Sequence, residues 1–210
     1  MSDFPSELAS PAGTTSVFRV VASLYLQEPS IELERPIKQY LAPYNRLANN
    51  LLRNDNLEIL RQEYADLFFV PVSGRYLPPF ESVQRKKRLW GPVTHKVAEI
   101  YQACHFKLQE VPASPLWQAQ FVPDHIGYEL AFVEALLQSR KAAPSSEACR
   151  ELDETVQQFW RRHLSPWITS YGRELANKAQ TGLYRYLGLL TEALGKEWER
   201  CLESTDGHKG

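Results

Sequence analysis

Cysteine is scarce in this chain, and the few that occur exclude two kinds of site. Among the 210 residues only three are cysteine, at positions 104, 149 and 201. Their number is odd, they lie far apart and no C-x-x-C pair occurs, so the sequence predicts neither a zinc knuckle nor a redox dithiol. Such cysteine usage is typical of a reducing compartment. We therefore expect a cytoplasmic protein.

An excess of charge and long apolar runs are also missing. Lysine and arginine total 24 against 25 acidic residues, which leaves a formal net charge of −1. A chain so balanced has no overall field to attract nucleic acid, and no apolar run approaches the ~20 residues of a membrane-spanning helix. The first twenty residues lack a basic segment followed by an apolar core, so no signal peptide is expected. We expect neither nucleic acid nor stable membrane insertion among its interactions.

Signals for β-strands are nearly absent. No segment alternates polar and apolar residues over several positions, and the only Asp-Gly pair lies in the polar C-terminal tail. Apolar residues instead recur at helical spacing, most clearly over residues 54–69, where Leu57, Leu60, Tyr64 and Leu67 form one stripe. The sequence therefore predicts an all-α protein, a single bundle of about seven or more helices.

The helical pattern divides the chain at proline-bearing segments. Helices are expected over about residues 14–29, 30–44, 54–69, 92–104, 124–140, 147–163, 167–175 and 182–202. We expect residues 1–13 and 204–210 to be disordered and residues 14–203 to form one helical domain. Residues 72–82 and 109–122 are expected to be loops, the second a hinge between two sub-bundles. Because a hinge allows copies to exchange helices, both a monomer and a domain-swapped dimer are compatible with the sequence.

One helix start carries more polar side chains than capping requires. Pro123 precedes Asp124, which is expected to be the N-cap of the helix that follows. His125 and Glu129 are four residues apart and therefore share a face. This pair is compatible with a hydrogen bond near the helix start, or with acid–base or metal chemistry that takes a further ligand such as His163. The second interpretation is a helical metal-dependent hydrolase.

The motifs of other enzyme classes do not occur. The chain contains no G-x-S-x-G elbow, no P-loop and no G-x-G-x-x-G, so neither a serine nucleophile nor a phosphate cradle is predicted. Cys104 continues the apolar stripe of residues 92–104 and is expected to be a buried thiol. The basic run Arg85-Lys86-Lys87-Arg88 is compatible with a phosphate-binding patch or with a solvated entry to a helix.

Four segments taken together resemble the TorD/DmsD family of redox-enzyme maturation chaperones. They are Tyr64-x-x-Leu67-Phe68 ending in Pro71; Pro78-Pro79-Phe80-Glu81-Ser82-Val83; Pro123-Asp124-His125-Ile126-x-x-Glu129-Leu130-x-Phe132; and Phe159-x-x-x-His163-Leu164-x-x-Trp167, followed by Tyr184. Their order and spacing are similar to the family from about residue 15 to 200. Three features depart from its pattern. Phe80 stands where tyrosine or tryptophan is frequent, the chain is strongly basic after Val83, and His105 stands where a glycine often closes the helix.

The resemblance implies a cytoplasmic all-helical chaperone that is not an enzyme and has neither cofactor nor metal. Such proteins bind the twin-arginine signal peptide or the apo-form of a molybdopterin oxidoreductase, and delay its export until the cofactor is inserted. The export machinery is a further partner that the resemblance allows. It implies binding residues in two segments, namely Pro79, Phe80, Glu81 and Ser82, with Pro123, Asp124 and His125. A related alternative is a NarJ-type chaperone, whose client stays at the membrane face.

The chemistry of a twin-arginine leader agrees with these residues. Two guanidinium groups require carboxylates, which Glu81, Asp124 and Glu129 supply. The apolar stretch of a leader requires a trough, in the manner of a helix held in a groove. We expect Tyr76, Leu77, Phe80 and Trp90 to line it, because aromatic residues on a proline-stiffened loop offer rigid contact surfaces. The same aromatic residues are also compatible with a small core of the loop itself.

Overall fold

The structure, a computed structural model, describes residues 17–30 and 56–206 and is all-α, as predicted. Its α-helices are α1 (Val17–Leu26), α4 (Leu57–Phe68), α5 (Glu81–Lys86), α6 (Pro92–Ala103), α7 (Pro115–Gln120), α8 (Ile126–Lys141), α9 (Ser146–Phe159), α10 (Ile168–Lys178) and α11 (Gly182–Asp206). Shorter turns are the 3-10 helices η3 (Pro71–Ser73) and η4 (Leu108–Glu110) and the π-helix η5 (Trp160–Leu164). The helix expected over residues 30–44 and the N-terminal segment 1–13 lie outside the described residues, apart from Ser30 itself.

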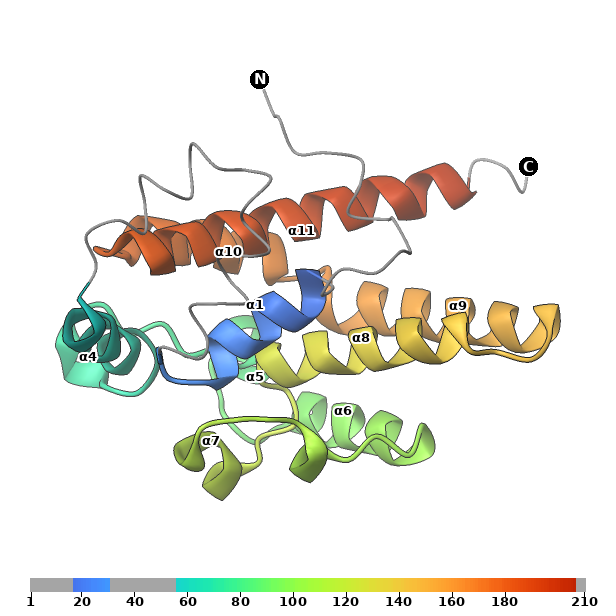
Figure 1. The fold of residues 1–210 in the computed structure, drawn as a ribbon, viewed down its shortest axis with the longest axis horizontal. Helices are drawn as coiled ribbons and strands as arrows, with labels where there is room; N and C mark the ends of the chain where they lie inside the picture. The colour runs from blue at the N-terminus through green and yellow to red at the C-terminus, as the bar shows by residue number, and fades with distance from the viewer. Residues whose placement is uncertain (1–16, 31–55, 207–210) are drawn as a thin grey trace.

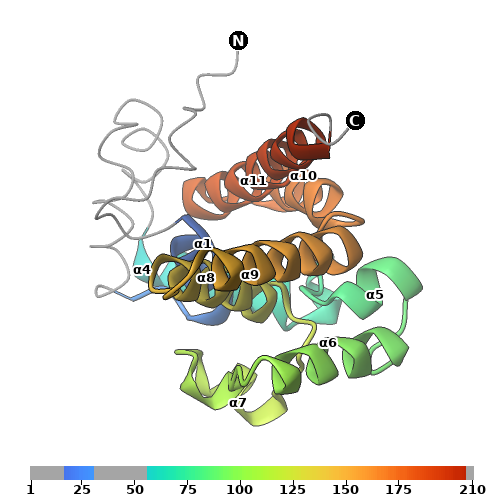
Figure 2. The same ribbon diagram turned by 90° about the vertical axis from the view of Figure 1, so that its right-hand side faces the viewer.

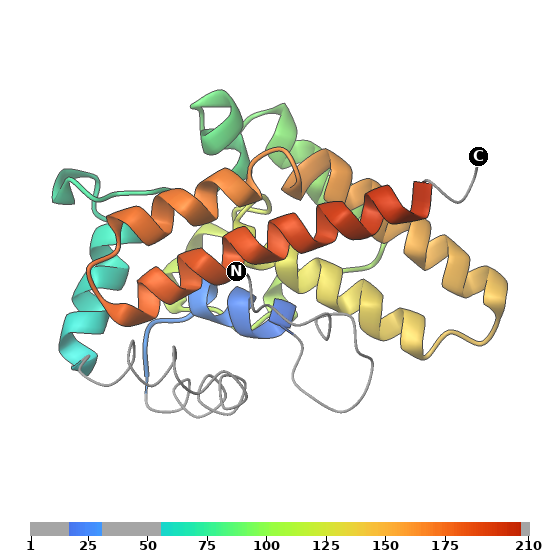
Figure 3. The ribbon, with the colours of Figure 1, turned by 90° about the horizontal axis from the view of Figure 1, so that it is seen from above.

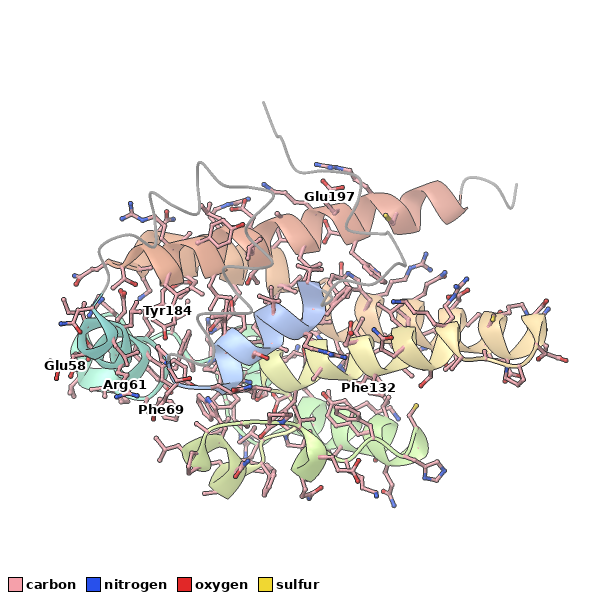
Figure 4. All side chains as sticks on the ribbon, viewed as in Figure 1. Glu58, Arg61, Phe69, Phe132, Tyr184 and Glu197 are labelled. Carbon is pink, nitrogen blue, oxygen red and sulfur yellow. The ribbon has the colours of Figure 1, made fainter. Side chains whose placement is uncertain are left out.

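The helices pack in three layers (Figure 1). The antiparallel pair α10 and α11 forms one layer, α1, α8 and α9 form the middle layer, and α6 and α7 lie on its other side (Figures 2 and 3). The middle layer supplies much of the core, since α8 buries residues around most of its circumference. Phe132 of α8 reaches toward α6, where it packs against Tyr101 and Phe106 (Figure 4). No helix in residues 17–30 and 56–206 has the length and apolar character needed to cross a membrane.

Residues 109–122 are largely folded, which corrects the expectation of an irregular loop. They contain the end of η4 and all of α7, and Trp117 anchors α7 in the core. The indole Nε1 of Trp117 donates to the carbonyl of Tyr25 at 3.1 Å and to the hydroxyl of Tyr64 at 2.7 Å. Its ring stacks on Phe69 at a centroid distance of 4.1 Å. A hinge in this segment, and with it an exchanged dimer, stays a prediction that requires this anchor to be released.

The C-terminal end of α6 forms a left-handed turn at a residue other than glycine. His105 has φ of 54°, its N–H donates to Gln102, and the next N–H, of Phe106, donates back to the Tyr101 carbonyl at 2.8 Å. This pair of bonds is a Schellman motif, with the rings of Tyr101 and Phe106 in contact across it. The turn has the geometry that glycine favours, although histidine occupies it. It also places Cys104 on the surface, so the prediction of a buried thiol was wrong.

Replacing His105 with glycine is expected to raise the free energy of unfolding by about 0.5–1 kcal/mol, because glycine adopts positive φ without a clash of its Cβ. The matched control is Gln102→Gly within α6, where the same residue is expected to cost about 1 kcal/mol. Urea unfolding followed by circular dichroism measures both. A His105→Gly protein that is less stable than the parent would show that the imidazole itself holds the turn.

The helices differ from those expected in two places. The helix α5 begins at Glu81, inside the segment predicted to be a loop. The basic run therefore closes a helix instead of opening one, with Arg85 and Lys86 in the last turn, where they complement the negative end of the helix dipole. At the other end of the chain α11 continues to Asp206, four residues beyond Leu202.

Candidate functional site

Two segments that are 42 residues apart in the sequence cap each other's helices. The segments 79–82 and 123–126, which we call the junction, meet in one antiparallel bridge between Phe80 and His125. Ile126, the first residue of α8, donates its N–H to the carbonyl of Pro79 at 2.8 Å. Glu81 and Ser82, the first residues of α5, donate theirs to the carbonyl and the carboxylate of Asp124, at 2.9 and 2.7 Å. The first turn of each helix thus obtains acceptors from the opposite segment.

The cap of α8 itself is His125 and not Asp124 as expected. The His125 Nδ1 atom accepts the N–H of Gly127 at 3.0 Å, which requires an unprotonated nitrogen. Complete burial lowers the pKa of His125 to about 3, so the ring is neutral at physiological pH. Phe80 and Trp117 contact the ring at centroid distances of 5.5 and 4.4 Å. His125 therefore serves as a fixed, uncharged part of the junction.

The junction encloses three carboxyl groups. Glu81, Asp124 and Glu129 each have an exposed fraction of 0%. Burial raises the pKa of Glu129 well above its usual value, and the nearby charges of Glu81 and Asp124 raise it further. The fold therefore favours the protonated form of Glu129 more than the unfolded chain does.

Glu81 has two cationic or hydrogen-bonding partners. His163, from the π-helix η5, places its Nδ1 atom 2.9 Å from Glu81 Oε2. Arg85, one turn along α5, forms a salt bridge with the other carboxylate oxygen and also donates to the Arg162 carbonyl at 2.8 Å. The Arg85 side chain is 29% exposed while the Glu81 side chain is 0% exposed. The partly exposed guanidinium of Arg85 thus contacts a carboxylate of Glu81 that solvent cannot reach.

The metal-dependent alternative requires His125, Glu129 and His163 around one ion. The structure commits both histidines elsewhere, since His125 caps α8 and His163 binds Glu81. Within residues 17–30 and 56–206, no group of three or more histidine, cysteine or acidic side chains is arranged to hold a metal ion. The geometry therefore offers no support for the hydrolase interpretation.

A surface groove of about 360 Å³ lies against one side of the junction. It is lined by the C-terminal part of α6, by residues 105–109 and by Pro123. Tyr101 lies between the groove and the carboxyl groups, and its hydroxyl donates to the carbonyl of Pro123 at 3.1 Å. Burial raises the pKa of Tyr101 well above its usual value, with added contributions from the charges of Glu129, Asp124 and Glu81. The acidic cluster therefore lies directly behind the wall of the groove.

The predicted site residues occupy three different environments. Nine of them are buried: Leu77, Pro79, Phe80, Glu81, Ser82, Pro123, Asp124, His125 and Glu129. Tyr76 is partly buried, and Trp90 is exposed on the turn after α5. The structure thus brings the two predicted segments together. It does not bring Tyr76, Leu77, Phe80 and Trp90 into one open trough, because Leu77 and Phe80 belong to the core.

Sequence reasoning missed the residues that form the groove. Tyr101 and Phe106 face both the core and the groove, whereas the apolar stripe of residues 92–104 indicates only a buried face. Trp117 holds Phe80 and His125 in place from α7. A tryptophan two residues after Ser114-Pro115, a frequent helix start, was the available signal for that anchor.

Glu129→Gln is expected to make the protein more stable near neutral pH. Since the folded-state pKa of Glu129 lies above its unfolded value, the folded protein binds this proton more tightly, and its stability falls as pH rises above about 4.5. Glutamine carries no proton to lose, so the advantage of the variant grows with pH and disappears below pH 4. Urea unfolding at pH 4 and pH 8 measures the difference. Equal stability of the two proteins at both pH values would contradict a raised pKa of Glu129 in the folded protein.

Comparison with known proteins agrees with this architecture. The family model described as nitrate reductase delta subunit matches residues 26–171, more than half of the chain. The chain belongs to this family. The match spans the junction and the groove, and it confirms the resemblance to chaperones of the NarJ and TorD types that assist the assembly of molybdoenzymes.

A solved structure with the same fold supports the assignment of the architecture. It is a protein of Archaeoglobus fulgidus, described as a candidate redox enzyme maturation protein, with 18% sequence identity and a TM-score of 0.51. The similarity covers 93% of this chain and 98% of that one. No match was found among curated proteins.

Proposed function

We propose that this assembly chaperone acts in the cytoplasm, where it binds the twin-arginine leader or the apo-form of a molybdopterin oxidoreductase and delays export until the cofactor is inserted. The observation that carries this proposal is the salt bridge between Arg85 and Glu81. It supports recognition of a guanidinium by the junction, since one such group already reaches the buried carboxylate from the surface. A client arginine would take the place of Arg85.

The groove supports binding of the apolar part of a leader. Tyr101, Phe106 and Leu108 contribute apolar surface, and its volume suits a few side chains more than a whole helix. The carboxylates behind its wall act through a medium of low dielectric constant, in which their field is screened less than in water. A leader whose apolar residues enter the groove would thus have its arginines drawn toward the junction.

The junction is closed to solvent, so a client must open it before reaching the buried carboxyl groups. Glu81, Asp124 and Glu129 are sealed from solvent, so an external guanidinium reaches them only if Arg85 is displaced or the bridge between Phe80 and His125 opens. Opening this bridge breaks only one isolated pairing of two backbone segments. Binding therefore requires a local rearrangement of residues 79–85. The charge-assisted hydrogen bond between the client guanidinium and a buried carboxylate, worth about 1.5–3 kcal/mol, would offset its cost.

Calorimetric titration tests this recognition. A leader peptide with two arginines is expected to bind, and the same peptide with two lysines to bind roughly 10- to 100-fold more weakly, because lysine cannot form the bidentate contact. The double variant Glu81→Gln with Asp124→Asn should lose the preference. The double variant Glu147→Gln with Asp153→Asn removes the same charge from exposed positions of α9 and should keep it. Equal affinity for both peptides would reject recognition of the arginine pair.

The NarJ-type alternative is favoured by the description of the matching family, which names nitrate reductase. The client of such a chaperone stays at the membrane face, so its recognition would not require paired arginines. The titration with the two leader peptides separates the alternatives, because a NarJ-type chaperone is expected to bind both peptides equally or not at all.

A further inference from the structure

We infer that the turn between α5 and α6 is a docking surface for an anionic lipid bilayer. We call residues 86–90 the basic turn. It begins at Lys86, the last residue of α5, and Lys86, Lys87 and Arg88 are exposed. Leu89 and Trp90 follow directly, with 39% and 50% of their surface exposed, and they are among the few large apolar residues on the surface. Cations beside an exposed tryptophan and leucine are the composition that binds the interface of a charged membrane.

A second basic segment lies beside this turn. Arg85 donates to the carbonyl of Arg162 at 2.8 Å, which brings the exposed pair Arg161 and Arg162 of η5 next to the end of α5. Among the described residues, Lys86, Lys87 and Arg88 form no ion pair with an acidic side chain. Since the net charge of the chain is −1, these residues concentrate positive charge on one part of a nearly neutral molecule.

Two residues of the turn have a left-handed backbone conformation. Lys87, with φ of 54°, is the C-cap of α5, and its N–H donates to the Val83 carbonyl at 2.8 Å. Trp90 has φ of 58°, which is a genuine outlier for a bulky residue and costs free energy. Half of its surface stays exposed, so burial of the indole ring does not offset that cost. The turn thus leaves an indole ring exposed beside the cations.

The exposed apolar residues of the turn favour a membrane over an acidic protein. The turn joins the two helices at the edge of the molecule (Figure 2), and the groove of about 360 Å³ is lined by the other end of α6 instead. A lipid headgroup layer accepts an exposed tryptophan and leucine, which anionic side chains of a protein would not contact favourably. The cations then face the anionic headgroups. This inference is independent of leader binding.

Vesicle flotation with the full chain tests the inference. We expect binding to vesicles that contain one-third phosphatidylglycerol, little binding to pure phosphatidylcholine, and loss of binding at high salt. The triple variant Lys86→Gln, Lys87→Gln, Arg88→Gln should bind roughly 100-fold more weakly, since each cation contributes about fivefold. The triple variant Lys141→Gln, Arg150→Gln, Lys178→Gln makes the same change of charge elsewhere and should bind like the parent. Equal affinity of both variants would overturn the inference.

The variant Trp90→Gly distinguishes a role of Trp90 in membrane binding from a role in the stability of the fold. Because glycine accepts positive φ, the variant should unfold at the same or a higher temperature than the parent, while its affinity for anionic vesicles falls about tenfold. A variant that loses thermal stability and keeps vesicle binding would assign Trp90 to the fold and overturn the inference. Binding to polyglutamate without binding to vesicles would also overturn it, and would assign the turn to an acidic protein surface.

Discussion

Gly172→Ala is expected to lower the free energy of unfolding by about 3 kcal/mol. At this position of α10 an added Cβ would lie 2.4 Å from the backbone nitrogen of Glu192 and 2.8 Å from the carbonyl oxygen of Gly188, both in α11. Backbone atoms cannot rotate away as a side chain does, so the two helices must separate along their contact. Gly188 makes the reciprocal approach, with a Cβ position 2.4 Å from the nitrogen of Ala176. Gly188→Ala is therefore expected to cost a similar amount.

The matched control for this prediction is Gly91→Ala. Gly91 precedes α6 with φ of −128°, which any residue adopts, and nothing lies within 4 Å of its Cβ position. The change should alter stability by less than about 0.5 kcal/mol. Urea unfolding of the three variants compares them directly. If Gly172→Ala were as stable as Gly91→Ala, the close contact of α10 and α11 would be disproved.

Asp124→Ala is expected to lower the free energy of unfolding by about 2 kcal/mol. Its carboxylate accepts the N–H of Ser82 in the first turn of α5, and alanine would leave that buried donor without an acceptor. Asp124→Asn retains an oxygen at the same position and should cost less, which separates the lost hydrogen bond from the lost charge. Thermal and urea unfolding measure both variants. An alanine variant as stable as the asparagine variant would show that Asp124 does not cap α5.

The elements of the fold could be read from periodicity because a helix that buries one face must repeat its apolar residues. The stripe from Leu57 to Phe68 became α4, and the pattern from Leu183 onward became α11. The same signal cannot show where helices meet. Gly172 and Gly188 allow the close contact of α10 and α11, yet a glycine within a helical stretch indicates nothing about its partner until the two helices are placed together.

The sequence indicated two segments of the candidate site but not their burial. The resemblance to the TorD/DmsD family implied that residues 79–82 and 123–125 act together, and the structure places them in contact. That Asp124 would cap α5, and His125 its own helix, depends on the register of the bridge between the segments, which the sequence does not contain. A similar contact joins Glu63 of α4 to the backbone N–H groups of Gln180 and Thr181, at 2.5 and 2.8 Å. Such contacts satisfy helix ends over long sequence separations and leave no local pattern.

Hydrogen–deuterium exchange with and without a twin-arginine leader peptide tests most directly whether the junction and its groove receive the client. We expect changed exchange in residues 79–87 and 123–129, where the bridge and the Arg85 contact rearrange, and slower exchange in residues 98–109 along the groove. The helices α9 and α11 away from this region should keep their rates. Binding of the peptide with no change in these three segments, and protection elsewhere, would show that the client binds at another surface.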